Sequence, residues 1–532
     1  MKRVLVGLLV TVAYTSLAFG DWSGLADDQL ISLFPNPVNY ISSYDEVVAA
    51  SPDGELYAVW AIGGTGTPYE VAFSKSTDNG RTWSGTTEDR IINAEDGEGI
   101  ISPTLQQNLS MAVGGSGNIY VVWAESLTNV SCEIMFIKST DGGSTWVHSD
   151  TDFPISFSGG NRALQPVIAV DIDENLHVIW QQNTGANAEI HYGFSSDYGD
   201  TWTSQSGDRA ISFANGNPSF NPDITADNDG NVYVIWKENS SPSPFGVINF
   251  GKKLATEPQF SCETEDISVC LPDTNTGTCS IVVTPNSSIH VVWEARHRIG
   301  TSYKGVIYYS RSTDGGATWS GLTGRQNVDQ DAFDDTTSSY PDMVATSQGD
   351  LAVVYSHEGS FTSPRVSLST DDGVTWSGNT MAEVISHYGG DDTRSAYNSD
   401  ICVSVGDTLH VVWHEDCLDL GGGSGYYEVM YSRGDTLGTS GQPGCEYMPG
   451  DINDSGEANG VDISYGVNYF KGFGPPPPVS CPDCPGPGEE LFAAGDVNGN
   501  CQFNGVDVTY FVNYLKGLGP DLTYCGNCPP AR

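Results

Sequence analysis

An apolar strand-like segment that ends in an aromatic residue recurs seven times along the chain. The aromatic residues are Trp60, Trp123, Trp180, Trp236, Trp293, Tyr355 and Trp413, and successive copies are 63, 57, 56, 57, 62 and 58 residues apart. A second strand-like segment precedes each one, separated from it by a turn rich in Gly, Asp and Asn. Two strands joined by such a turn form a β-hairpin. The spacing therefore predicts a repeated antiparallel unit as the basis of the fold.

A distinctive turn follows five of these units. It reads Ser-x-Asp-x-Gly-x-Thr-Trp at Ser76–Trp83, Ser139–Trp146, Ser195–Trp202, Ser312–Trp319 and Ser369–Trp376. Asp can accept hydrogen bonds from turn amides, Gly supplies a positive φ, and Trp can pack back over the strands. The turn is missing from the fourth unit, after Val247–Phe250, and from the seventh, after Met430–Ser432.

This turn resembles the Asp box of sialidases and of bacterial neuraminidase repeats, and the resemblance covers residues 22–440. It implies an all-β fold, a seven-bladed β-propeller with four strands in each blade. The segment Gln29–Leu33 is similar to the fourth strands of other units, and no such strand follows Ser432. We therefore expect the N-terminal segment to pair with the last blade, which leaves no open sheet edge.

The composition changes after Gly444, where a 45-residue duplication begins. Oxygen-bearing side chains recur at the spacing of an EF-hand-like loop that wraps calcium. An apolar segment at helical spacing follows each loop. The candidate ligands, predicted to bind two Ca²⁺ ions, are Asp451, Asn453, Ser455, Glu457, Asn459 and Asp462 in the first loop, and Asp496, Asn498, Asn500, Gln502, Asn504 and Asp507 in the second.

A duplicated calcium loop followed by one helix resembles a dockerin, which implies a small α-helical domain and a cohesin-like or cell-surface protein partner. Two departures from the dockerin pattern are present. The sixth loop residue is Gly456 in the first copy but Cys501 in the second, and Gly-Val pairs occupy the positions where many dockerins carry Ser-Thr. We expect the second loop to bind calcium more weakly, because Cys501 replaces the glycine that eases the turn.

Each repeat ends in Cys-x-x-Cys-Pro, at Cys481 and Cys484 and again at Cys525 and Cys528. Four thiolates at this spacing can hold structural zinc. An exported chain favours disulfides instead, and the same argument predicts that most of its 12 cysteines are paired.

The N-terminus indicates export. Lys2 and Arg3 precede an apolar run from Val4 to Ala18, and small residues at Ala18 and Gly20 suit a signal peptidase. The predicted organisation is a signal peptide at residues 1–20, the propeller at 21–440, a linker at 441–449 and the dockerin-like module at 450–532. No later apolar run is long enough to span a membrane. The net charge of −45 disfavours nucleic acid as a partner. These features predict an extracellular or cell-surface protein.

Catalysis is less clearly indicated than binding. Asp boxes are structural turns, and the Arg-Ile-Pro signature of sialidases is absent, the nearest string being Arg90-Ile91-Ile92. Propeller topology places the turns after the second and fourth strands on the face opposite the boxes, where longer loops carry function. Candidate ligand-binding residues on that face are Arg162, Arg325, Arg394, Glu238, Glu294 and Glu415.

Arginine offers a planar fork for carboxylates, and paired acids can hydrolyse glycosides. Three functions follow, ranked in this order: recognition of an extracellular glycan by a sialidase-like propeller displayed through its tail, exo-acting glycoside hydrolysis, and a non-catalytic structural or adhesion role. The alternative is that these charged residues are solvated side chains of surface loops and bind no ligand.

Overall fold

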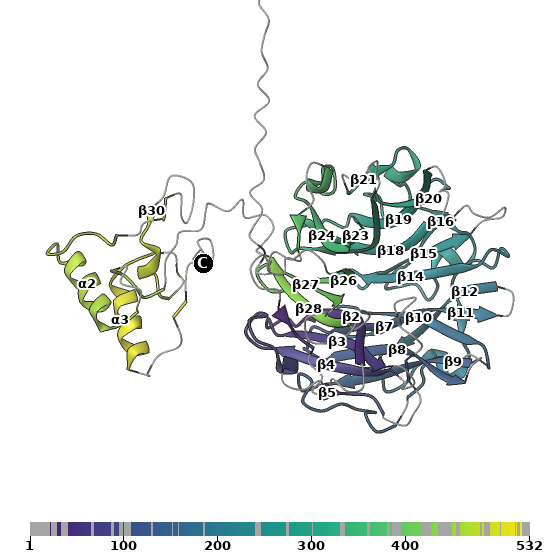
Figure 1. Ribbon diagram of the computed structural model, residues 1–532, viewed down its shortest axis with the longest axis horizontal. Helices are drawn as coiled ribbons and strands as arrows, with labels where there is room; N and C mark the ends of the chain where they lie inside the picture. The colour runs from purple at the N-terminus through teal and green to yellow at the C-terminus, as the bar shows by residue number, and fades with distance from the viewer. Residues whose placement is uncertain are drawn as a thin grey trace, which may run out of the picture. The chain divides into compact units, whose positions relative to one another are not determined.

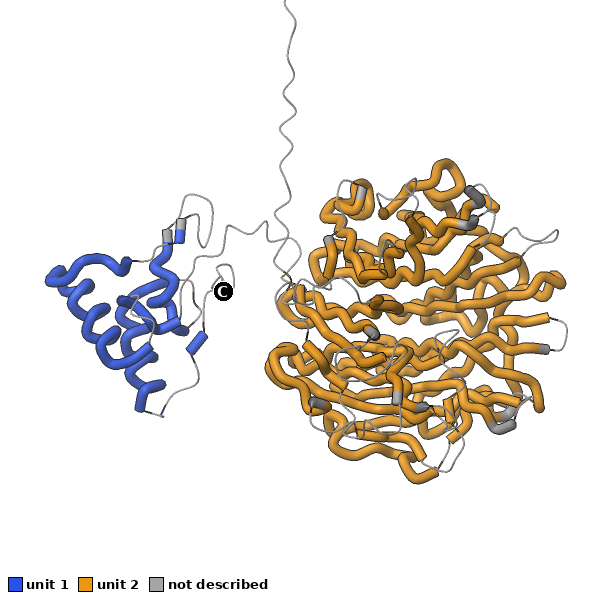
Figure 2. The backbone as a smooth tube through the Cα atoms, viewed as in Figure 1, with its two compact units in different colours: residues 1–19, 439–532 blue, residues 20–438 orange. Residues whose placement is uncertain are grey.

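The structure is a computed structural model in which the chain forms two compact units, residues 20–438 and a second unit that includes residues 439–532 (Figure 2). The residues described are 22, 29–32, 41–64, 69–86, 90–94, 99–100, 108–128, 131–151, 153–157, 159–184, 187–239, 246–272, 276–299, 302–329, 336–358, 362–379, 383–385, 395–416, 427–434, 449–453, 458–478, 481–482, 490–498, 500, 502–516, 518 and 522–523.

The larger unit is built from antiparallel sheets (Figure 1). Its described strands form six sheets, five of four strands and one of eight strands that joins two repeats through a parallel pairing of β9 with β10. The repeats are numbered here as groups one to seven in chain order. The first four groups are β2 (Ile41–Ala50), β3 (Leu56–Gly64), β4 (Glu70–Ser76) and β5 (Arg90–Ile91); β6 (Gly99–Ile100), β7 (Leu109–Val113), β8 (Ile119–Thr128) and β9 (Ser131–Ser139); β10 (Arg162–Val170), β11 (Leu176–Thr184), β12 (Asn187–Ser195) and β13 (Arg209–Ala210); and β14 (Ser219–Ala226), β15 (Val232–Asn239), β16 (Gly246–Lys253) and β17 (Ile267–Ser268).

The remaining groups continue the same order. They are β18 (Thr276–Val283), β19 (Ile289–Ile299), β20 (Ser302–Ser312) and β21 (Gln326–Asn327); β22 (Thr337–Ala345), β23 (Leu351–Glu358), β24 (Thr362–Ser369) and β25 (Glu383–Val384); and β26 (Ala396–Val403), β27 (Leu409–Asp416) and β28 (Tyr427–Gly434) with β1 (Gln29–Leu30). A fully buried aromatic residue lies in the second strand of every group, at the seven positions that define the repeat.

The N-terminal segment pairs with group seven, as the sequence predicts. Gln29 lies opposite Tyr431 and Leu30 opposite Met430, and the amide of Ile31 donates to the carbonyl of Val429 at 3.0 Å. The next residue, Ser32, is fully buried and donates to a carboxylate oxygen of Glu428 at 2.7 Å. Ser212 and Glu189 make the same contact inside group three, at 2.6 Å. The segment therefore serves as an ordinary fourth strand.

The Asp-box turns are hydrogen-bonded as predicted. In group three, the carboxylate of Asp197 accepts from the hydroxyl of Ser195 at 2.7 Å, the amide of Thr201 at 2.9 Å and the hydroxyl of Thr201 at 2.6 Å. The box Trp202 is buried and packs edge-on against Phe136 of group two, with ring centroids 5.2 Å apart. A Cβ on Gly199 would meet the same phenyl ring at 2.3 Å. The box therefore also locks neighbouring groups together.

Groups four and seven lack the box but keep an aromatic residue for this contact. In group four, Phe260 is buried and packs edge-on against Tyr192 of group three at 5.0 Å. In group seven, Trp22 is 4% exposed and belongs to the hydrophobic cluster that contains Val366 of group six. Its indole fills the space beside Gly434 of β28, where a Cβ would come within 2.8 Å. The N-terminal segment thus supplies both a strand and an aromatic plug.

The innermost strands carry a β-bulge in six groups, with register shifts in β2, β10, β14, β18, β22 and β26. Five bulges place a non-glycine residue at positive φ, namely Asp45, Gln165, Asn221, Tyr340 and Asn398. Aspartates after three bulges accept backbone hydrogen bonds from the next group, from Ile281 to Asp223, Ile401 to Asp342 and Val48 to Asp400. Polar side chains therefore link the innermost strands to one another.

The cysteines that the structure describes in the larger unit correct one expectation. Cys132, Cys262, Cys270, Cys279 and Cys402 are thiols and not disulfides, and four of them are buried. Cys262, Cys270, Cys279 and Cys402 pack among apolar side chains of the sheets, where a thiol behaves as a small hydrophobic group. Burial raises the pKa of Cys279 and Cys402, so these thiols are held in the unreactive neutral form.

The smaller unit contains the helices α2 (Gly460–Phe470) and α3 (Gly505–Leu515), one after each predicted calcium loop. Asn459 and Asn504 cap them, each in a reciprocal capping box with an aspartate three residues later. Ile452, Val497 and Phe511 form its buried core, and the short strands β29 (Cys481–Pro482) and β30 (Glu490–Leu491) pair beside it. Cys481 is disulfide-bonded. Among the described residues, no helix is long and apolar enough to cross a membrane.

Candidate functional site

The non-box face is the edge of the larger unit where the first strands begin and the second strands end. The Asp boxes follow the third strands and therefore lie at the other edge. Two clusters of functional side chains lie near the bulges on the non-box face. The charged cluster comprises Lys237, Glu294, Arg296, Tyr340 and Glu358, and the aromatic cluster comprises Tyr44, Tyr69, Tyr397, His414 and Tyr427.

The charged cluster is centred on an ion pair at the end of β19. The Nε of Arg296 donates to a carboxylate oxygen of Glu294 at 2.5 Å, and the Glu294 side chain is 1% exposed whereas that of Arg296 is 45% exposed. Burial lowers the pKa of Lys237, and the negative charge of Glu294 opposes this shift. Glu294 thus pairs with Arg296 and attracts Lys237, while the guanidinium of Arg296 stays partly open to solvent.

Backbone geometry makes room for this carboxylate. Group five has Gly277 in its bulge, where five other groups carry a larger residue. A Cβ at Gly277 would lie 2.5 Å from an Oε atom of Glu294 and 2.7 Å from its carboxyl carbon. Because no side chain blocks the approach, the Glu294 carboxylate can lie against the innermost strand.

Tyr340 joins the charged cluster to group one. It occupies the bulge of β22 at φ +52° and is half-buried. Its pKa is raised by burial first, then by the negative charges of Glu294, Glu358 and Asp45, with Arg296 acting in the opposite direction. Groups one, five and six therefore bring charged side chains close to one phenol.

The aromatic cluster forms where groups seven and one meet. The imidazole of His414 lies 5.5 Å from the ring of Tyr44, 5.9 Å from Tyr397 and 5.2 Å from Tyr427, measured between centroids. Glu46 holds it in place by accepting from the backbone amide of His414 at 3.1 Å and contacting its Nδ1 at 3.0 Å. The tyrosines are half-buried, so part of each ring faces solvent.

A pair of acids lies farther along the same face, in group four. Glu238 is 4% exposed, and one amide nitrogen, Nδ2 of Asn215, donates to it at 3.1 Å and to Asp266 at 2.6 Å. Asn217 and Asn249 donate to Glu238 as well. Burial and the neighbouring charge of Asp266 raise the pKa of Glu238 to about 7. A carboxyl group in this state can hold a proton near neutral pH.

The structure separates the residues predicted from sequence. Glu294 lies in the charged cluster and Glu238 in the acid pair, whereas buried Glu415 accepts from the indole of Trp413 in its own strand at 3.1 Å. Arg162 is exposed, with its Nε 3.4 Å from the sulfur of Cys132. Arg325 is exposed and lies over the ring of Tyr308 at 5.6 Å. It precedes the fourth strand β21 and does not follow it, so its predicted place in a turn after a fourth strand is wrong. Arg394 falls outside the described residues.

Sequence reasoning did not nominate Lys237, Arg296, Tyr340 or the aromatic cluster. Lys237, Glu294 and His414 each directly follow the aromatic residue of a second strand. Aligning the seven units at that residue would have shown a charged or imidazole side chain at one equivalent position in three of them. The sequence motifs indicate loops, whereas these residues lie within strands β15, β19 and β27.

The calcium-loop residues form two polar turns in the smaller unit. Asp462 and Asp496 are fully buried, and Asp507 is 1% exposed. An oxygen of Asn453, Oδ1, is buried without a hydrogen-bond partner, so it fits an oxygen-ligated cation. Among the described residues, no three His, Cys, Asp or Glu side chains gather as a metal site. Ser455 and Glu457 lie outside the described residues.

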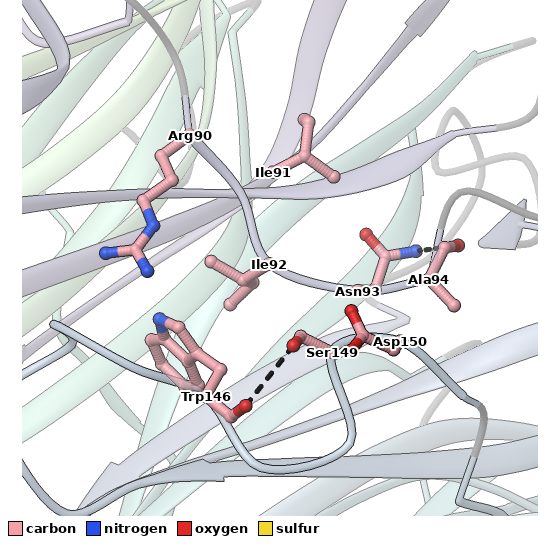
Figure 3. Close-up of a pocket in the computed structure, with 8 residues that line it drawn as sticks. All are labelled: Arg90, Ile91, Ile92, Asn93, Ala94, Trp146, Ser149 and Asp150. Atoms are coloured by element: carbon pink, nitrogen blue, oxygen red, sulfur yellow. Dashed lines mark hydrogen bonds between the residues drawn. The ribbon is translucent and has the colours of Figure 1, made fainter.

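A cavity of about 490 Å³ lies on the rim between groups one and two, away from the predicted ligand-binding residues (Figure 3). Arg90, Asn93, Trp146 and Asp150 contribute to its lining. The guanidinium of Arg90 donates to the carbonyls of Gly143 at 2.5 Å and Ser144 at 2.8 Å, both in the next Asp box. These hydrogen bonds of Arg90 link group one to group two.

Comparison with known proteins agrees with the repeat structure. A family described as a BNR repeat-like domain matches residues 40–248. No curated protein matches the sequence significantly. Residues 40–248 therefore resemble BNR repeats, in agreement with the repeated antiparallel sheets and Asp-box turns of the larger unit.

Solved structures of similar fold include the polysaccharide lyase Uly1, at 10% identity over 80% of this chain and 98% of that chain, with a TM-score of 0.49. An α-L-arabinanase of Penicillium chrysogenum is 14% identical over 76% of this chain and 98% of that one, with a TM-score of 0.44. The Hadza microbial sialidase Hz136 is 15% identical over 59% of this chain and 63% of that one, with a TM-score of 0.39.

Proposed function

We propose that this chain is a secreted protein that recognises an extracellular glycan on the non-box face of its propeller, and that its tail is a calcium-stabilised, dockerin-like docking module. The observation that carries the proposal is the charged cluster. The chain has only 22 Lys and Arg residues against 67 acids, yet Lys237 and Arg296 lie together beside the innermost strands.

A cation kept at this position has a chemical use. The guanidinium of Arg296 is partly exposed and offers planar donors to a carboxylate or sulfate. The rest of the surface is strongly acidic and repels such a group, so binding would be confined to the cluster. Arg162, Arg325 and Arg394 remain candidate outer contacts of the same ligand, and Glu238, Glu294 and Glu415 remain candidates for binding its hydroxyl groups.

A glycan array probed with the full chain and with Arg296→Gln tests this function. We expect wild-type protein to bind acidic glycans and the variant to bind them at least 10-fold more weakly, since a charged hydrogen bond contributes about 1.5–3 kcal/mol. Arg81→Gln, an exposed arginine in the first Asp box, is the matched control. Unchanged binding by Arg296→Gln would remove the charged cluster from the ligand site.

A second candidate function is exo-acting glycoside hydrolysis. The acid pair supports it, because a carboxyl group whose pKa is about 7 beside a second carboxylate has the chemistry of a general acid. A fluorogenic glycoside screen tests it. Activity that is lost in Glu238→Gln but retained in Glu257→Gln, at an exposed position outside both clusters, would favour hydrolysis. Inactivity across the panel would favour recognition or a non-catalytic structural or adhesion role.

The tail proposal rests on the two polar loops. Their aspartates, together with amide oxygens, suit Ca²⁺, and we propose that cohesin-like or cell-surface proteins bind the module. For the Cys-x-x-Cys pairs we propose disulfides, supported by the disulfide at Cys481, rather than zinc. Calcium should raise the unfolding temperature of the tail in the full chain, with the effect reduced in Asp507→Asn. An unchanged thermogram after chelation would contradict this proposal.

We also propose that the seven strand groups are seven blades of one ring closed by β1, and that the chain is exported by cleavage after residue 20. The pairing of β1 with β28 supports closure. The burial of Trp22 supports cleavage close before it, because the indole lies within the fold. Mass spectrometry of the secreted protein tests the cleavage, and an N-terminus beyond Trp22 would contradict it.

A further inference from the structure

The two clusters on the non-box face differ in chemistry. The aromatic cluster offers half-buried tyrosine rings around a fixed imidazole, and the charged cluster offers cations around a buried carboxylate. A tyrosine ring packs against the apolar face of a sugar while its hydroxyl reaches polar groups. A guanidinium selects a carboxylate or sulfate. Each cluster therefore suits a different kind of sugar unit.

The clusters are close enough to serve one ligand. Tyr44 directly precedes the bulge residue Asp45, so the aromatic cluster adjoins the innermost strand of group one. Strand β22, which carries Tyr340 of the charged cluster, packs against β26, which carries Tyr397 of the aromatic cluster, and the amide of Asn398 donates to the hydroxyl of Ser356 in group six at 3.1 Å. One short ligand lying across the face would reach both sets of side chains.

The aromatic cluster also discriminates against acids. Glu46 is 4% exposed and holds the imidazole of His414. A second anion placed among these tyrosines would approach the carboxylate of Glu46. The charge pattern thus favours a neutral unit here and an acidic unit at Arg296 and Lys237.

We infer, on the basis of the proposed function, that the ligand is an oligosaccharide in which a neutral sugar packs against the tyrosines around His414 and a neighbouring acidic sugar pairs with Arg296 and Lys237. The fixed imidazole keeps the rings in place before the ligand arrives, which reduces the entropy lost on binding. Neither cluster alone accounts for both units.

The test uses an array of disaccharides that join one uronic acid to one hexose or 6-deoxyhexose. Each is accompanied by its carboxyl-reduced form, by the diuronate and by the free uronic acid. We expect a mixed disaccharide to bind at least 10-fold more tightly than each of these three. Thermal unfolding of every variant confirms that it is folded.

Two variants separate the clusters. Arg296→Gln should reduce the preference for the acid over its carboxyl-reduced form to less than 3-fold. Tyr427→Leu should weaken both forms by the same factor, about 5-fold or more, and leave that preference intact. Arg81→Gln and Tyr198→Leu, both in Asp-box turns, are the controls and should bind as wild type does.

The outcomes distinguish this inference from the proposed function. Equal binding of the diuronate and the mixed disaccharide, or of the free uronic acid and the mixed disaccharide, overturns the inference and leaves glycan recognition standing. A Tyr427→Leu variant that changes the acid preference overturns it as well. If wild-type protein binds no carbohydrate on the array, both the proposed function and the inference fail.

Discussion

Aspartates in the Asp-box turns and aspartates on the innermost strands have opposite electrostatic environments. Hydrogen bonds from the amide and hydroxyl of Thr145 lower the pKa of Asp141 to about 2. Burial, together with the negative charge of Asp342, raises the pKa of Asp223 to about 7. The turns therefore hold charged carboxylates that stabilise the fold, whereas the innermost strands hold carboxylates that destabilise it when charged.

The comparison shows that the box turns stabilise the fold, whereas the innermost strands contain features that destabilise it. Box turns combine satisfied carboxylates with aromatic residues packed against the next blade. The innermost strands contain residues at positive φ and the buried carboxyl groups of Asp342 and Asp400, whose pKa values are raised by burial. Such costs concentrate at functional sites, in agreement with a ligand site on the non-box face.

The largest expected effect is the loss of a box aromatic contact. Trp202→Ala should lower the free energy of unfolding by about 3–5 kcal/mol, because the buried indole leaves a cavity between neighbouring groups. Phe260→Ala should cost a similar amount if it replaces the missing box of group four. Denaturant unfolding measures both. Phe157→Ala, at a 63% exposed position, is the control and should cost less than about 0.5 kcal/mol.

A smaller loss is expected from the box glycine. Gly199 has φ +84°, and a Cβ there would collide with Phe136, so Gly199→Ala should cost about 2–4 kcal/mol. Gly54 has φ +91° with nothing within 4 Å of a Cβ, so Gly54→Ala isolates the backbone strain of about 1 kcal/mol. Equal losses in the two variants would mean that φ alone, and not packing against the next blade, requires glycine in the box.

These glycines mark what the sequence could and could not predict. The repeat, the hairpins, the hydrogen bonds of the box and the pairing of the N-terminal segment follow from local turn chemistry and strand periodicity, which a single chain displays. The aromatic partner of each box lies in a different group, 66 residues away for Trp202 and Phe136 and 348 for Trp83 and Tyr431, so motif spacing gives no indication of it. Trp22 and Phe260 were missed for the same reason.

The candidate site was harder to predict than the fold. The sequence indicates Glu294 and Glu238 as acids near the ends of second strands. The position of the Glu294 carboxylate depends on the bulge at Gly277, which no sequence motif predicts. Arg296 lies within strand β19 and not in a loop, so the loop motifs did not indicate it. For the cysteines of the larger unit, export to an oxidising compartment predicted disulfides. The described ones are thiols, and most of them pack in the hydrophobic core.

An Asp→Asn substitution is expected to have opposite effects on the free energy of unfolding in the two regions. The raised pKa of Asp223 means that the stability present below about pH 4 is lost as the pH rises through 7. Asp223→Asn should therefore stabilise the protein by about 1–3 kcal/mol at pH 8 and have little effect at pH 4. Asp141 has a lowered pKa, so its contribution is present above about pH 4 and is lost as the pH falls through 2.

Asp141→Asn should accordingly destabilise the protein at neutral pH, with a difference from wild type that shrinks towards pH 2. Unfolding measured at several pH values for both variants checks the pair. If Asp223→Asn is destabilising at pH 8, the inner-strand carboxylates stabilise the fold in their charged state and the contrast between the two regions is wrong.

The smallest expected effect concerns the ion pairs of the box edge. Lys75 and Glu55 are 2.7 Å apart, with side chains 23% and 27% exposed, and Glu55 also accepts from the hydroxyl of Tyr57 at 2.6 Å. Glu55→Gln should cost about 0.5 kcal/mol or less, because solvent screens the pair and the amide oxygen still accepts from Tyr57. Added salt should shrink the difference further. A loss above about 1 kcal/mol that persists in 1 M salt would show that charge pairs, as well as hydrogen-bonded turns and aromatic packing, stabilise this edge.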